Sequence, residues 1–240
     1  MTNSPEKDHS TTKGLSTMYD SNPLPPTRVL LADAHRSTAD ALAYVFQNVY
    51  NMIVVTTTSE TDETMEAIQF HKPQLVLLSV DLPGRSPFSL AAELTKEYPD
   101  INVAFLADRP SDVLVDQAIR AGARGYLLKT EPVLELVQHC RRIATGGTSF
   151  AAEVKDRLEK KEGSRTYRLD SKSSLSALTK RQLEVLRRLA EGDSVKKIAS
   201  DLHISSKSVD SHKYRLMQRL GIHDRVELCR LAIREGLIQA

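Results

Sequence analysis

Hydrophobic residues between positions 27 and 150 fall into five short continuous runs, each followed by a stretch with helical periodicity. The runs are rich in Leu, Val and Ile, which favours strands that are buried on both faces. Strands that alternate with helices predict an α/β fold with a doubly wound, five-stranded parallel sheet. The expected strands are 28–32, 52–55, 74–78, 101–106 and 125–128, and the expected helices are 38–49, 60–71, 87–98, 111–121 and 132–145.

A different pattern occupies residues 178–220, where apolar positions recur every three or four residues in three consecutive segments. Thr179 followed by Gln182 predicts a capping box at the start of the first helix, and Gly192 supplies the left-handed residue that ends it. Two further helices joined by a tight turn predict a helix-turn-helix, whose second helix can enter a DNA major groove. These helices are expected at 195–202, capped by Asp193 and Ser194, and after Ser205-Ser206 up to Gly221.

The polar residues of the third helix suit contacts with DNA. Lysine and arginine neutralise phosphates, aspartate accepts from a cytosine amino group, and serine or tyrosine reaches base edges. A solvated outer face of any three-helix bundle has the same pattern, so the residues alone leave both interpretations open. The candidate DNA contacts, which include two lysines of the second helix, are Lys196, Lys197, Ser206, Lys207, Ser208, Asp210, Ser211, Lys213, Tyr214 and Arg215.

Charge separates the two halves of the chain. The net charge is only +2, but residues 27–150 carry 11 basic against 15 acidic side chains, whereas residues 178–240 carry 13 against 8. The basic half contains the predicted helix-turn-helix. This asymmetry is what a phosphate-binding module requires.

Composition also limits the remaining classes. No apolar run approaches the ~18 residues of a membrane span, and the N-terminus shows no signal segment, so we expect a cytoplasmic protein. Cys140 and Cys229 lie in separate predicted helices and favour reduced, packed thiols over a disulfide or metal site. We expect no catalytic residue, cofactor or metal.

Three segments complete the predicted organisation. Residues 1–26 are rich in Ser, Thr and Pro, which is typical of a disordered tail. Residues 151–177 are expected to link a domain at 27–150 to one at 178–240, with a charged helix over 152–162 and a flexible tether over 163–176. Such a tether would let the first domain either cover the third helix or release it. A fourth helix is expected over 226–235.

Residues 178–238 contain a series of short motifs, namely L-T-x-R, E-V-L, A-E-G, K-x-I-A, L-x-I-S and K-S-V-D-x-H. They resemble the LuxR-type DNA-binding domain at the C-terminus of NarL/FixJ response regulators. Gln182 stands where the family usually has glutamate, and it still completes the cap. The resemblance implies base contacts by Asp210, Ser211 and Tyr214, with Lys207 and Lys213 on phosphates or bases.

The same resemblance implies a homodimer on double-stranded DNA. One module reads a short half-site, so a two-fold pair on an inverted repeat is expected. In the family, the fourth helix forms the dimer surface, which here implies Leu228, Leu231 and Ala232; the alternative is that this apolar stripe closes the core of its own domain.

Residues 27–150 contain L-L-A-D-x-H, P-x-L-V-L-L, L-P-G and A-G-A-R-G-Y-L-L-K, and so resemble a receiver domain with a flavodoxin-like fold. A standard receiver has two acids after its first strand, an acceptor aspartate after the third, a Ser or Thr after the fourth and a Lys after the fifth. Asp33 and Lys129 match this pattern. Ala34, Ser79 and Ala107 depart from it.

These departures predict a degenerate phosphorylation pocket. Mg²⁺ requires carboxylate oxygens, and Asp33 alone is a poor cage. The Ser79 hydroxyl is inert without an activating base, and Ala107 has no hydroxyl. We therefore expect Lys129 to pair with Asp33, and a transcriptional regulator controlled without aspartyl phosphorylation, by dimerisation, a ligand or a partner protein.

Three alternatives stay open at this stage. Asp81, two residues beyond Ser79, could serve as a phosphoryl acceptor in a conventional two-component regulator, although its spacing to Pro83 is shorter than the family's. The acidic domain could instead belong to a protein-binding signalling scaffold. Asp33, His35 and Ser79 also have the residue types of a hydrolase triad, but no nucleophile elbow surrounds the serine.

Overall fold

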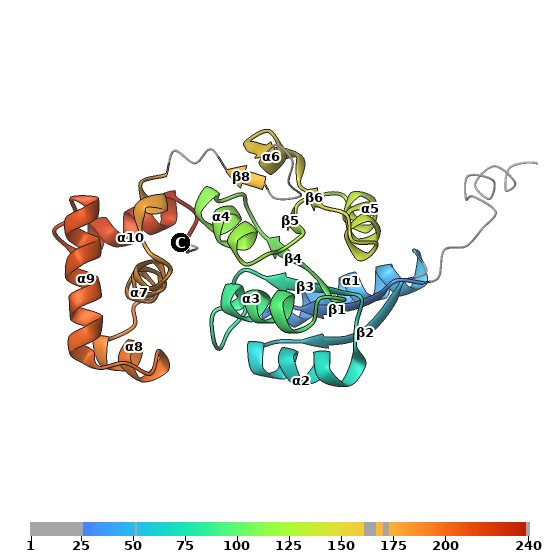
Figure 1. Ribbon diagram of the computed structural model, residues 1–240, viewed down its shortest axis with the longest axis horizontal. Coiled ribbons are helices and arrows are strands. Elements are labelled where there is room, and N and C mark those ends of the chain that lie inside the picture. Colours follow the sequence, from blue (N-terminus) through green and yellow to red (C-terminus); the bar gives the residue numbers. More distant parts are fainter. Residues whose placement is uncertain (1–25, 51, 161–166, 170–172, 239–240) are drawn as a thin grey trace, which may run out of the picture.

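The computed structural model describes residues 26–50, 52–160, 167–169 and 173–238, which form two domains and parts of the segment between them (Figure 1). The predicted disordered tail, residues 1–26, lies outside the described residues except for Pro26. Among the helices of the described ranges, none has the length and apolar character needed to cross a membrane.

The first domain is a parallel sheet with the strand order β2-β1-β3-β4-β5-β6. Helices α1 and α5 cover one face, and α2, α3 and α4 cover the other (Figure 1). The strands are β1 (Arg28–Ala32), β2 (Ile53–Thr58), β3 (Leu75–Ser79), β4 (Asn102–Ala107), β5 (Gly125–Leu128) and β6 (Ser149–Phe150). The helices are α1 (Arg36–Asn48), α2 (Thr61–His71), α3 (Pro87–Glu97), α4 (Asp112–Arg120) and α5 (Val133–Ala144).

Both faces of this sheet are buried, which confirms the α/β fold expected from the continuous apolar runs. Successive residues of β1 alternate between the two cores: Val29 packs with α1 and α5, whereas Leu30 packs with the opposite layer. On that second side, Phe88 of α3 stacks on Phe105 of β4 with ring centroids 4.5 Å apart. The two cores fix the strands and therefore the positions of the residues at the strand ends.

The sheet has six strands, so the expectation of five is wrong. β6 pairs in parallel with β5, and Ser149 lies opposite Gly125. Glycine is required there, because a Cβ at position 125 would lie 2.6 Å from the Ser149 carbonyl oxygen. A strand of two residues is too short for hydrophobic periodicity to reveal it.

The described part of the linker contains short elements that its composition does not indicate. The charged helix predicted over 152–162 is only the single turn α6 (Ala152–Lys155), and it is followed by β7 (Leu158–Lys160). β7 pairs antiparallel with β8 (Tyr167–Leu169), inside the predicted tether, and a 3₁₀ turn spans Ser174–Ala177. The segment is polar on average, so its composition does not show that three of its apolar side chains are buried. These are Val154, Leu169 and Leu175.

The second domain consists of α7 (Lys180–Ala190), α8 (Val195–Asp201), α9 (Ser206–Leu220) and α10 (Arg225–Arg234). The predicted capping box is present, since Thr179 accepts from the Gln182 amide and Gln182 accepts from the Thr179 amide. Ser194 and Ser205 cap α8 and α9 as expected. Gly221, with φ of +65°, ends α9 in the left-handed conformation. The starts of α7, α8 and α9 and the end of α9 are therefore encoded by their local sequence.

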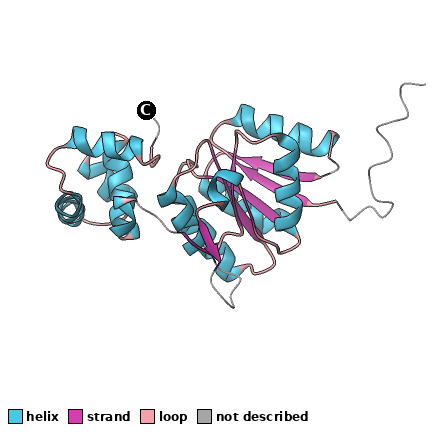
Figure 2. Cartoon of the chain, turned by 90° about the horizontal axis from the view of Figure 1, so that it is seen from above, coloured by secondary structure: helices cyan, strands magenta, loops and turns pink. Residues whose placement is uncertain are grey.

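The two domains touch through α7 and the residues that follow α10. Arg187 of α7 contacts the loop after β3, and the Glu235 carbonyl accepts a hydrogen bond from Ser111 at the start of α4. α9 packs on α7 and α8 and lies on the side of its domain away from the sheet (Figure 1). A view turned by 90° likewise separates the all-helical domain from the sheet (Figure 2). The first domain therefore does not cover α9.

The capping box should contribute measurably to the free energy of unfolding of the helical domain. Thr179→Ala removes the oxygen that accepts from the Gln182 amide and should lower the free energy of unfolding by about 1 kcal/mol. Urea unfolding of the full chain, followed by circular dichroism, measures this change. Thr179→Ser keeps the cap and should behave like the natural chain; equal losses in both variants would show that the cap contributes little.

Candidate nucleic-acid interface and carboxyl-edge pocket

Four strands of the receiver-like sheet end at one pocket. We call Asp33, Ala34, Ser79, Ala107 and Lys129 the carboxyl-edge pocket, because each follows or ends a strand at the carboxyl edge of the sheet. Parallel strands bring their carboxyl ends to the same edge, which is where α/β proteins place functional residues.

An ion pair closes this pocket. Lys129 Nζ lies 2.7 Å from Asp33 Oδ2, and both side chains are largely buried. The other carboxylate oxygen of Asp33 accepts from the His35 amide at 2.9 Å, and Asp108 lies 3.6 Å from the lysine. The pairing of Lys129 with Asp33 expected from the sequence is confirmed.

Ser79 lies at the end of β3 and is only 1% exposed. Its hydroxyl accepts a long hydrogen bond, 3.4 Å, from the Asp81 amide. His35 is bound to Asp33 instead, and no hydrogen bond in the described part of the chain joins His35 to Ser79. Among the described residues, no base is hydrogen-bonded to the Ser79 hydroxyl, so the geometry gives the hydrolase interpretation no support.

Asp81, the alternative phosphoryl acceptor, is engaged by the other domain. Arg187 Nη2 donates to Asp81 Oδ1 at 2.8 Å, and Nη1 donates to the Val80 carbonyl at 3.0 Å. No sequence pattern marks this pair, because the two residues lie 106 positions apart and arginine is common on exposed helix faces.

The candidate DNA contacts of α9 gather on its outer face. Tyr214 is 63% exposed, and its hydroxyl accepts from Gln218 at 2.6 Å. Ser208 is half-buried and belongs to the helix cap, since its amide and hydroxyl both contact Ser205. Lys213 is half-buried, and the exposed candidates of α9 are Ser206, Lys207, Asp210, Ser211, Tyr214 and Arg215.

The two candidate lysines of α8 are exposed but differ in their surroundings. Lys197 Nζ lies 2.6 Å from Asp193 Oδ1, and Arg188 contacts the other oxygen of Asp193 at 3.1 Å. Burial alone would raise the pKa of Asp193, but the hydrogen bonds from Lys197 and Arg188 outweigh it and lower that pKa. The carboxylate therefore offsets part of the Lys197 charge, so we expect Lys196 to attract phosphate more strongly.

Arg225, the first residue of α10, has a structural role. Its guanidinium donates to the Leu189 carbonyl at 2.7 and 3.0 Å and to the Asp193 carbonyl at 3.2 Å. These bonds tie the start of α10 to the end of α7, where the Leu189 carbonyl also accepts from the Gly192 amide at 3.3 Å.

The residues expected at a dimer surface require correction. Leu228, Leu231 and Ala232 are 1%, 7% and 0% exposed, because α10 packs against α7. They close the core of their own domain and cannot contact a second chain in this conformation. The exposed face of α10 instead carries Val226, Arg230 and Arg234.

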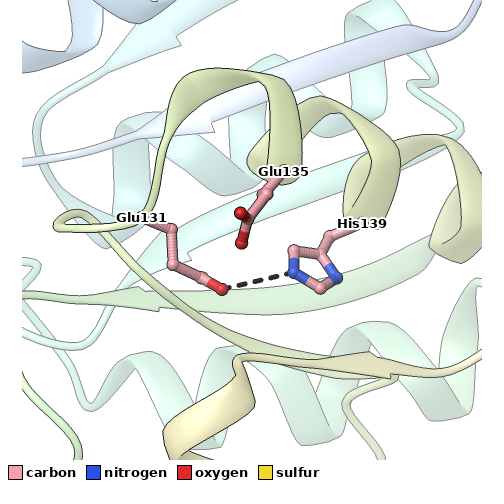
Figure 3. A group of neighbouring side chains, drawn as sticks. All are labelled: Glu131, Glu135 and His139. Atoms are coloured by element: carbon pink, nitrogen blue, oxygen red, sulfur yellow. Dashed lines mark hydrogen bonds and ion pairs between the residues drawn. The ribbon is translucent and has the colours of Figure 1, made fainter.

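Glu131, Glu135 and His139 bring metal-ligand atom types within 4.8 Å of one another beside α5 (Figure 3). Both ring nitrogens of His139 already have protein partners: Nδ1 lies 2.7 Å from the Ser149 hydroxyl and Nε2 lies 3.3 Å from Glu131. Glu131 also accepts from the Leu128 amide. The group therefore acts as a clamp that ties the loop after β5 to β6.

Both cysteines are free thiols. Burial raises the pKa of the Cys140 thiol to about 12, so this thiol stays protonated and packs as an apolar group. Cys229 donates to the Ala190 carbonyl at 3.5 Å. These contacts agree with the packed, unbridged thiols expected from the sequence.

Comparison with known proteins identifies both domains. Residues 29–141 match the response regulator receiver domain, and residues 176–232 match the luxR family of bacterial regulatory proteins. The response regulator GacA of Pseudomonas protegens is 27% identical over 213 residues, covering 89% of this chain and 98% of GacA. The response regulator UvrY of Escherichia coli is 27% identical, covering 88% of this chain and 96% of UvrY.

Solved structures show the same fold. The RcsB response regulator of Salmonella typhimurium aligns with a TM-score of 0.69 at 18% identity, covering 86% of this chain and 96% of RcsB. RcsB bound to the rprA promoter aligns with a TM-score of 0.63 at 17% identity, covering 88% of this chain and 99% of that chain.

A receiver fold followed by a helix-turn-helix defines the class of DNA-binding response regulators. Within that class, the chain belongs to the NarL/FixJ family, with a LuxR-type DNA-binding domain. Its members are transcription regulators of two-component systems.

The Asp33–Lys129 pair predicts a specific pattern of stability. Lys129→Ala leaves a buried carboxylate without its cation and should cost about 3–5 kcal/mol. Asp33→Ala combined with Lys129→Ala removes both charges and should cost less than Lys129→Ala alone. Denaturant unfolding of the two single variants and the double variant measures the coupling; additive losses would contradict it.

Proposed function

We propose that this chain is a sequence-specific transcriptional regulator whose receiver acts without aspartyl phosphorylation. The observation that carries the proposal is the carboxyl-edge pocket, in which Lys129 is paired with Asp33 and the third strand ends in a buried serine. Ala34 supplies no second carboxylate for Mg²⁺, and Ala107 supplies no hydroxyl to follow a phosphoryl group. The lysine that would meet a phosphoryl group is thus already neutralised.

The exposed face of α9 supports the DNA-binding half of the proposal. Lys207, Tyr214 and Arg215 are exposed on the helix that follows the turn, and the basic charge of the chain gathers in the same domain. RcsB, which shares the fold, has been solved as dimers bound to DNA. We infer that this chain likewise binds an inverted repeat as a homodimer, in the cytoplasm of a bacterium, and that a ligand or protein partner acts at the receiver.

The phosphorylation half is tested with acetyl phosphate and Mg²⁺. The natural chain should gain no adduct of roughly 80 Da, the mass of a phosphoryl group, by intact-protein mass spectrometry. The matched comparison carries Ala34→Asp and Ser79→Asp, which supply the missing carboxylates. An adduct on the natural chain that disappears in Asp81→Asn would instead identify a conventional regulator that uses Asp81.

The DNA-binding half is tested by selecting duplexes from a random pool with the full chain. Binding to the enriched duplex should weaken with salt, with a log–log slope of roughly −0.9 per neutralised phosphate. Lys207→Ala should weaken binding to most sequences, whereas Asp210→Ala should blur the preference at one base pair by about 1–3 kcal/mol. Failure to enrich any sequence would favour the signalling scaffold.

A further inference from the structure

One end of the interface between the domains is held by Arg187 of α7. Its Nη atoms donate to the Val80 carbonyl and to Asp81, and its Nε donates to Glu191 of its own helix at 2.9 Å. Val80 and Asp81 directly follow Ser79 in the carboxyl-edge pocket. The arginine thus binds both the backbone and a side chain of one receiver loop. These two contacts fix the orientation of α7 relative to that loop as well as the distance between them.

The other end of the interface is held by the residues after α10. The Ser111 hydroxyl donates to the Glu235 carbonyl at 2.8 Å, and Leu237 is 2% exposed beside Ala107 and Leu114. A cavity of about 310 Å³ lies beside these contacts and is lined by both domains. The interface is therefore not packed throughout, and loss of one anchor should free the domains to turn. We call the Arg187 and Leu237 contacts together the clasp.

Neither anchor covers α9, which is the recognition helix of the proposed DNA-binding domain. α9 packs on α7 and α8, on the side of its domain away from the sheet (Figure 1). Its outer residues, such as Lys207 and Arg215, are exposed while the clasp is closed. Docking therefore does not hide the surface that would meet DNA.

We infer that Arg187 is a positioning residue: through the clasp, the receiver sets the direction in which α9 projects, and the docked chain binds DNA without opening. This inference rests on the proposed function for its DNA-binding readout. The clasp also assigns a use to the carboxyl edge that needs no phosphoryl group, because the contacting loops follow Ser79 and Ala107.

A disulfide across the clasp provides the direct test. A Cβ at Gly236 would lie 3.3 Å from the Ser111 Cβ, close to the ~3.5–4.5 Å of a disulfide. Ser111→Cys with Gly236→Cys, in a Cys229→Ala background, should cross-link under mild oxidation. The oxidised protein should bind the duplex enriched by the natural full chain within about twofold of the reduced protein.

The outcomes of that experiment separate the two proposals. A loss of more than tenfold in affinity on oxidation, reversed by reductant, would overturn the inference because the chain would have to open. Failure to cross-link would overturn it as well, provided that the reduced double variant has the circular dichroism of the natural chain. If no duplex is enriched at all, the proposed function fails, and the rate of cross-linking still measures the clasp.

Arg187→Ala tests the positioning role in two backgrounds. In the double-cysteine chain it should slow cross-linking several-fold. In the natural background, which keeps Gly236, it should leave affinity for a single half-site unchanged. It should also weaken discrimination among inverted repeats of different spacing. Glu191→Gln is the matched control, since it removes only the negative charge beside Arg187 within α7 and leaves the contacts with Val80 and Asp81 in place.

Two results with Arg187→Ala would contradict the inference. A rise of more than tenfold in half-site affinity would mean that the receiver masks the recognition helix. An unchanged spacing preference would mean that the arginine does not orient the domain.

Discussion

A buried carboxylate must be paired, and in this receiver Lys129 meets that constraint for Asp33. The pair joins the ends of β1 and β5, so the lysine reaches past the ends of β3 and β4, which lie between them in the sheet. Those two strands end in the small residues Ser79 and Ala107, both buried. Small side chains there suit a lysine that crosses the edge, whereas a third carboxylate would compete for the same ammonium.

Much of this architecture was predictable because its causes are local. Continuous apolar runs predict β1 to β5, and the edge rule for parallel strands predicts that Asp33, Ser79 and Lys129 lie together. Cap residues such as Thr179 and Ser205 fixed the helix boundaries for the same reason. β6 and the β7–β8 hairpin were missed because two or three residues are too few to show a period, and their stability comes from pairing partners.

Contacts over long sequence separations were out of reach of pattern analysis. Arg187 lies on an amphipathic helix whose polar face predicts only exposure, and nothing local marks it as the partner of Asp81. The error at α10 has another cause. Leu228 lies on an apolar stripe, and a stripe shows that a face is buried without showing whether its own domain or a second chain buries it.

The position of the clasp constrains how any signal could act on this receiver. The loops after β3 and β4 border the carboxyl-edge pocket and also hold Arg187 and Leu237. A ligand or partner at that edge would therefore meet the same groups that hold the DNA-binding domain. It could change the orientation of that domain only to the extent that it binds the clasped and unclasped states with different affinity. Because α9 is open in the clasped state, such a ligand would, in the proposed homodimer, alter the geometry of the two α9 helices more than the access of either one to DNA.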